Sequence, residues 1–185
     1  MSTTMSALPP PSMIPSLPQD QQFQVLDTLF ESSPEIHTLM APVLANQPFP
    51  TYDLLIDAVG GRMSALSAAN SPTDRTILTG ILGSHPRLGR PKVNPEHLSE
   101  LSQKEQANLN VGAEEQAEKL RVLNAEYEER FPGLRFVTFV NGRNREVIMD
   151  EMRMRINRGD AEQEIIETIK AMCDIAKDRA SKLLQ

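Results

Sequence analysis

Several residue types that support particular functions are scarce in this chain of 185 residues. Tryptophan is absent and aromatic residues make up only 4%, so the chain offers few rings on which single-stranded nucleic acids could stack. Its net charge of -6 repels phosphate backbones. A single cysteine, Cys173, excludes an internal disulfide framework and fits a reducing compartment. We therefore expect no nucleic-acid partner, and we interpret Cys173 as a small buried hydrophobe rather than a nucleophile.

Basic residues are missing from the first third of the chain. Six acidic residues but no lysine or arginine precede Arg62, whereas secretory signals and mitochondrial presequences need basic residues. No stretch approaches the ~18 uninterrupted apolar residues of a membrane helix. The C-terminal letters "SKLLQ" do not end in a readable peroxisomal tripeptide. We expect a soluble protein with no membrane partner, located in the cytoplasm or the peroxisome.

Proline and charge divide the chain into two parts. Residues 1–18, "MSTTMSALPPPSMIPSLP", contain five prolines and no charge, so they can neither continue a helix nor bury much surface. We predict that they form a flexible leader. Residues 19–185, in a chain with 39% hydrophobic residues, are numerous enough for one domain with a real core.

Helix signals dominate that domain. Residues 112–131 repeat apolar positions at spacings of three and four, which is one face of a long helix. The segment "FVTFV", residues 136–140, is extended in composition but has no second strand to pair with, so we interpret it as a buried connector. Helix starts are predicted where a capping side chain precedes a first turn, at Ser33-Pro34, Ser71-Pro72, Asn94-Pro95, Asn144 and Asp160. The sequence predicts an all-α single domain of about eight or nine helices.

One arginine stands among the apolar positions of the last helix. Arg179 follows Met172 by seven residues and precedes Leu183 by four, so it lies on the helix face that should meet the core. Burying an unpaired guanidinium costs several kcal/mol. Something anionic must therefore meet Arg179, either a structural carboxylate or a ligand.

Two polar motifs each allow two interpretations. In "ILGSHPRLGRP" His85 precedes Pro86, which disfavours the helical backbone at His85 and places the ring at a helix-to-loop boundary. Such a ring can be catalytic, although helix ends also carry histidines without any function. In "SQKEQ" Ser102 and Glu105 have the spacing of a capping box, and they could instead line a site with Gln106. His85 and His97 are too far apart to face one metal from one helix, so no metal site is expected.

Four motifs occur together in order: "SHPRLG", "LSQKEQANL", "LNAEYEERFPGLRFVTFVNGR" and "AMCDIAKDRASKLL". This set, over about residues 20 to 184, resembles the 2-oxo-4-hydroxy-4-carboxy-5-ureidoimidazoline (OHCU) decarboxylases of urate breakdown. The resemblance implies a helical bundle that decarboxylates OHCU to (S)-allantoin, with a small ureidoimidazoline as substrate. It also implies that the protein is a homodimer.

The resemblance also implies roles for individual residues. His85 would be the catalytic acid-base group, and Glu105 would orient the substrate or His85. The substrate-binding residues would be Pro86, Ser102, Gln106, Arg179 and the segment Phe136, Val137 and Thr138. The substrate carries its own ring imine as an electron sink, so no cofactor and no metal would be needed. The alternatives are a non-catalytic helical interaction module and a family member that acts on another ureide.

Overall fold

The computed structural model describes residues 5–89, 101, 102, 104 and 114–184. Within these residues all the regular structure is helical, as predicted. The elements, in chain order, are η1 (Pro11–Ser16, a 3-10 helix), α1 (Gln19–Phe30), α2 (Pro34–Asn46), α3 (Tyr52–Ala69), α4 (Pro72–Leu82), α6 (Glu114–Arg130), α7 (Arg145–Arg158) and α8 (Ala161–Leu183).

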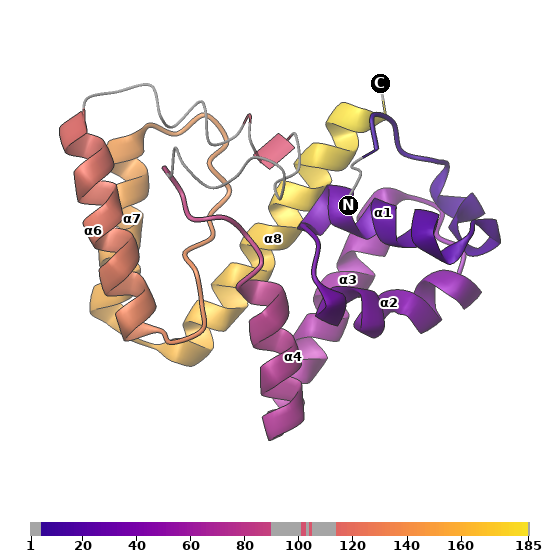
Figure 1. Ribbon diagram of the computed structural model, residues 1–185, viewed down its shortest axis with the longest axis horizontal. Helices are drawn as coiled ribbons and strands as arrows, with labels where there is room; N and C mark the ends of the chain where they lie inside the picture. Colours follow the sequence, from indigo (N-terminus) through magenta and orange to yellow (C-terminus); the bar gives the residue numbers. More distant parts are fainter. Residues whose placement is uncertain (1–4, 90–100, 103, 105–113, 185) are drawn as a thin grey trace.

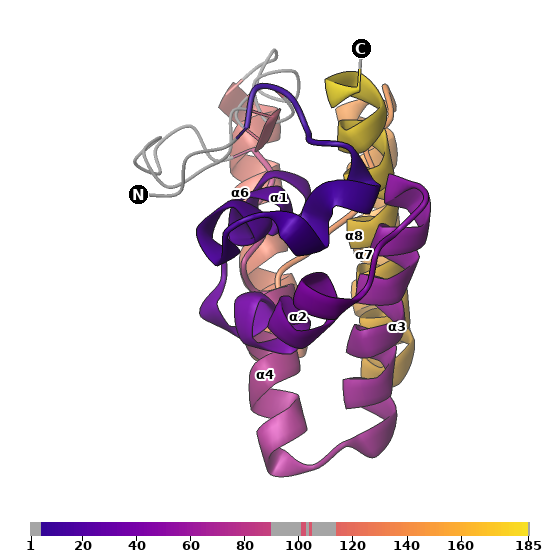
Figure 2. The ribbon, with the colours of Figure 1, turned by 90° about the vertical axis from the view of Figure 1, so that its right-hand side faces the viewer.

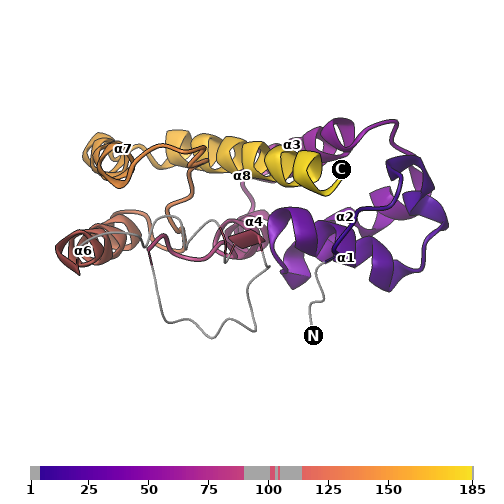
Figure 3. The same ribbon diagram turned by 90° about the horizontal axis from the view of Figure 1, so that it is seen from above.

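The helices form two layers (Figures 1, 2 and 3). One layer contains α7, α8 and α3, and the other contains α6, α4, α1 and α2. Helix α8 runs obliquely through the middle of the molecule in Figure 1, so it connects the α6–α7 end with the end formed by α1, α2 and α3. Its apolar face packs mainly on α3 and α1. Buried Leu26, Leu55, Met63, Met172 and Ala176 lie in this core.

Side-chain caps start the helices where the sequence predicted them. Ser33, Ser71, Asn144 and Asp160 each accept a hydrogen bond from the backbone amide three residues later, which satisfies an amide that has no partner inside its helix. The long helix expected over residues 112–131 is α6. The start predicted at Asn94-Pro95 lies outside the described residues.

The N-terminal segment behaves differently from the flexible leader that composition predicted. Residues 5–18 pack on the domain, with Ile14 fully buried and Leu8 9% exposed. The Tyr52 hydroxyl donates to the Pro9 carbonyl at 2.6 Å, and the Gln22 amide donates to the Ile14 carbonyl at 3.1 Å. Prolines prevent an α-helix here, but the 3-10 turn η1 still directs Ile14 into the core.

The segment that follows α6 is the buried connector expected at residues 136–140. It has no strand partner among the described residues, and Phe136 and Val137 are 2% and 3% exposed.

No helix in the described part of the chain is long and apolar enough to cross a membrane.

Candidate active site

A cavity of about 380 Å³ lies beside His85, between the loop after α4, the connector after α6 and the C-terminal half of α8. Six residues named from the sequence line it, namely His85, Pro86, Ser102, Phe136, Val137 and Thr138. Glu105 and Gln106 lie outside the described residues. Arg179 is not among the residues that line the cavity. The fourth motif is represented on the wall by Ile175, Asp178 and Lys182, so the fold brings all four motifs together at one cavity.

The loop that carries His85 is fastened to the neighbouring helix. Helix α4 ends at Leu82, and His85 lies in the loop beyond it, where its carbonyl accepts a hydrogen bond from Arg135 at 3.2 Å. Arg87 forms a two-pronged ion pair with Glu128 of α6. These contacts fix the position of the imidazole at the cavity wall.

The His85 ring is buried and electrically neutral at pH 7. Only 5% of the residue is exposed, and Nε2 has no hydrogen-bond partner among the described residues. Burial, the largest cause, and the nearby charge of Arg179 both lower the pKa of His85, the Glu31 carboxylate opposes them, and the resulting pKa is about 4. A neutral imidazole can accept a proton from a molecule bound in the cavity.

The anion that meets Arg179 is a carboxylate of the protein itself. Arg179 is fully buried, and its Nη2 lies 3.1 Å from Glu31 Oε1. The same nitrogen donates to Ser102 Oγ at 2.8 Å, and Nη1 donates to the Leu29 carbonyl at 3.2 Å. Of the two partners left open by the sequence, the structural carboxylate is the one observed. Direct contact between Arg179 and a substrate stays a prediction.

Ser102 joins this ion pair to the cavity. Its hydroxyl donates to Glu31 and accepts from Arg179, and the residue also lines the cavity. These partners are 71 and 77 positions away in the chain. Ser102 is therefore part of a tertiary cluster, whereas the capping-box alternative depends on Glu105, which lies outside the described residues.

Glu31 is the residue that the sequence interpretation missed. It follows the last residue of α1 with φ 70° and ψ 152° and is 4% exposed. A residue other than glycine in this backbone region costs about 1–3 kcal/mol, and such strain is concentrated at functional sites. The sequence limits where its partner can lie: residues 1–61 contain no lysine or arginine, so an ion pair of Glu31 with either type has to join a distant segment.

The remaining titratable groups give the cavity its charge. Arg143, Asp178 and Lys182 lie on its wall, and Lys182 Nζ is 2.6 Å from Asp178 Oδ2. In the described part of the chain, no group of three or more His, Cys, Asp or Glu side chains could hold a metal ion. Cys173 is half-buried on α8, and burial raises its pKa to about 11, which fits the interpretation as a hydrophobe.

Comparison with known proteins adds one finding. A family model described as OHCU decarboxylase matches residues 15–181 of the chain. No curated protein matches the sequence.

Proposed function

The chain belongs to the OHCU decarboxylase family, a family of carboxy-lyases in urate breakdown, and we propose that the reaction takes place in the cavity beside His85. The observation that carries this proposal is the His85 ring itself. It is buried at the cavity wall, and its Nε2 has no partner among the described residues. A polar atom buried without a partner is costly in a folded protein, which suggests that the partner is a ligand.

We assign proton transfer to His85. When the bond between the substrate ring and its carboxylate breaks, carbon dioxide leaves and the electron pair moves into the ring imine. One proton must then be delivered to carbon. Neutral His85 takes up the proton of the substrate hydroxyl and, as the imidazolium, returns it to the ring carbon from a single face, which accounts for one hand of allantoin. The ring nitrogen that received the electron pair takes one further proton from water. A step of this kind contributes about 10² to 10⁴ in rate.

Ser102 on the cavity wall, with Glu31 and Arg179 behind it, supports this chemistry. Arg179 holds the Glu31 carboxylate and the Ser102 hydroxyl, so the hydroxyl is kept in one orientation beside the substrate. The charge of Arg179 also helps to keep His85 neutral and favours an anion in the cavity. Glu105 and Gln106 are proposed to complete the site, Glu105 by orienting the substrate or His85 and Gln106 by binding a ureido or ring amide.

Two finer proposals rest on family likeness. We propose that the protein is a homodimer, and that it acts in the cytoplasm or the peroxisome. Sedimentation of the full chain tests the oligomeric state, and imaging of the full chain in cells tests the compartment.

The experiment that tests the active site follows allantoin by circular dichroism while the upstream enzymes generate the substrate from urate. Wild-type protein should accelerate decay of the substrate and give a single enantiomer. His85→Asn should fold normally and lose roughly 10² to 10⁴ in rate. His37→Asn is the matched control, because His37 pairs with Asp27 away from the cavity, and it should keep wild-type activity.

Either of two results would contradict the proposal. Wild-type protein that changes neither the rate nor the handedness of decay would exclude decarboxylation in this cavity. Full activity of His85→Asn would exclude His85 as the proton-transfer group.

A further inference from the structure

The connector that forms one wall of the cavity is an extended segment without a strand beside it. Residues Phe136 to Val140 all line the cavity, and none of the described residues accepts a hydrogen bond from their backbone amides. Buried backbone groups need partners. Some other part of the protein must therefore hold this segment in its shape.

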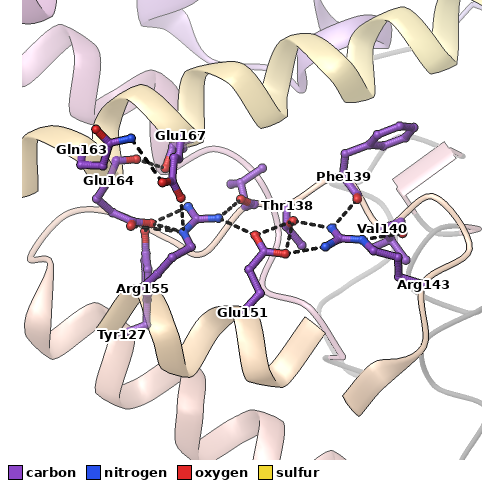
Figure 4. Close-up of polar contacts among 12 residues, drawn as sticks. Tyr127, Thr138, Phe139, Val140, Arg143, Glu151, Arg155, Gln163, Glu164 and Glu167 are labelled. Atoms are coloured by element: carbon purple, nitrogen blue, oxygen red, sulfur yellow. Dashed lines mark hydrogen bonds and ion pairs between the residues drawn. The ribbon is translucent and has the colours of Figure 1, made fainter. Parts of the chain in front are cut away.

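Two arginines hold it by its carbonyl groups (Figure 4). Arg155 of α7 donates from Nη1 to the Val137 carbonyl at 3.1 Å. Arg143 donates from Nη2 to the Phe139 carbonyl at 2.6 Å and from Nε to the Val140 carbonyl at 3.2 Å. The guanidinium is suited to this task because its donors form a rigid planar fork.

Glu151 of α7 connects the two arginines. Its carboxylate lies 2.6 Å from Arg143 Nη1 and 3.1 Å from Arg155 Nη1, and it accepts a hydrogen bond from the Thr138 hydroxyl at 3.0 Å. Glu151 itself does not line the cavity. Any effect of Glu151 on the substrate must therefore pass through the connector and Arg143.

Arg155 is anchored on its other side. It is 1% exposed, and its Nε donates to the fully buried Glu164 of α8 at 2.9 Å. Its guanidinium carbon lies 4.6 Å from the centre of the Phe136 ring, a distance typical of a cation–π contact. The connector is thus tied through α7 to α8, which also lines the cavity.

We propose that Arg143, Glu151 and Arg155 form a network that sets the conformation of residues 136–140 for substrate binding, with Glu151 as a positioning residue. This inference rests on the proposed location of the active site. The amides of residues 136–140 have no acceptor among the described residues, so a connector held in this shape by its carbonyls can donate them to the oxygen atoms of an anionic ureide. Loosening the network should weaken substrate binding more than it slows the chemical step at His85.

The test compares Glu151→Gln with Glu167→Gln. Both carboxylates contact Arg155 and have similar side-chain exposure, 21% and 29%, but only Glu151 contacts the connector through Thr138. Both substitutions should lower the melting temperature by similar amounts. Glu151→Gln should raise KM roughly tenfold with a smaller change in kcat, because displacement of a binding group by about 1 Å can cost up to 10²-fold. Glu167→Gln should keep the wild-type KM.

The outcomes separate this inference from the proposed function. A wild-type KM for folded Glu151→Gln, or an equal rise in KM for both variants, would overturn the positioning role while an inactive His85→Asn still supported the site. Full activity of His85→Asn would instead remove the site on which the inference rests. If Glu151→Gln does not fold, Glu151→Asp replaces it, because that variant keeps the charge but is one methylene too short to hold all three partners. A wild-type KM for Glu151→Asp would then overturn the proposal.

Discussion

The buried His85 ring couples the protonation of a single residue to the stability of the fold. Its pKa is about 4 in the folded protein, whereas the ordinary value, which applies to the unfolded chain, is 6.5. Between these values the unfolded chain takes up a proton that the folded protein does not, so the free energy of unfolding falls as the pH falls. The contribution is complete above about pH 6.5 and is lost as the pH falls to about 4.

We therefore predict that wild-type protein loses more stability than His85→Asn when the pH is lowered from 6.5 to 4. Urea unfolding at several pH values measures the difference, in which the titration of all other groups cancels to first order. Parallel curves for the two proteins would show that His85 titrates as it does in the unfolded chain.

The Arg179–Glu31 pair gives a second prediction at this scale. Arg179→Met removes the guanidinium 3.1 Å from Glu31 in a buried site, and breaking one side of a buried pair costs about 3–5 kcal/mol. The double variant Glu31→Gln with Arg179→Met should recover part of this loss. Chemical denaturation measures both. A stable Arg179→Met protein would show that the ion pair contributes little to the fold.

Helix α3 contains two adjacent glycines, Gly60 and Gly61, and only Gly60 lies close against another helix. A Cβ built on Gly60 would lie 2.8 Å from Cys173 Sγ of α8, whereas a Cβ on Gly61 would meet nothing within 4 Å. Adjacent glycines inside a helix can indicate either close packing or a bend. Close packing is what occurs, and only Gly60 takes part in it.

Alanine substitutions at these two glycines should consequently change the free energy of unfolding in opposite directions. Gly60→Ala should destabilise the protein by about 1–3 kcal/mol through overpacking, and Gly61→Ala should stabilise it by up to about 1 kcal/mol through helix propensity. Combining Gly60→Ala with Cys173→Ala should restore most of the loss. Thermal melts of the variants check this, and equal effects of the two glycine substitutions would contradict the packing argument.

At the scale of the whole molecule, the N-terminal segment completes the core. Ile14→Ala should cost about 2–5 kcal/mol because the residue is fully buried. Met13→Ala is the control next to it, since Met13 is 53% exposed, and it should change stability by no more than about 0.5 kcal/mol. Denaturation midpoints of the two variants give the comparison. Indistinguishable midpoints would restore the interpretation of this segment as a leader that contributes little.

Local rules in the sequence were sufficient for the helix starts, and the family resemblance pointed to several residues that line the cavity. Caps at Ser33, Ser71, Asn144 and Asp160 could be predicted because each is a contact between residues only three positions apart. The ordered motifs pointed to His85, Ser102 and the connector, which the structure brings to one cavity. The family match over residues 15–181 agrees with that resemblance.

Only the tertiary structure decided which groups meet. The partner of Arg179, the packing of Ile14 and the contacts of Glu151 with Arg143 and Thr138 join residues that no helical pattern links. Composition predicted that residues 1–18 bury little surface, yet Ile14 in a 3-10 turn is enough to anchor residues 5–18. The physical reason is that helix periodicity and capping are properties of neighbours in sequence, whereas the pairing of buried charges depends on how whole helices pack.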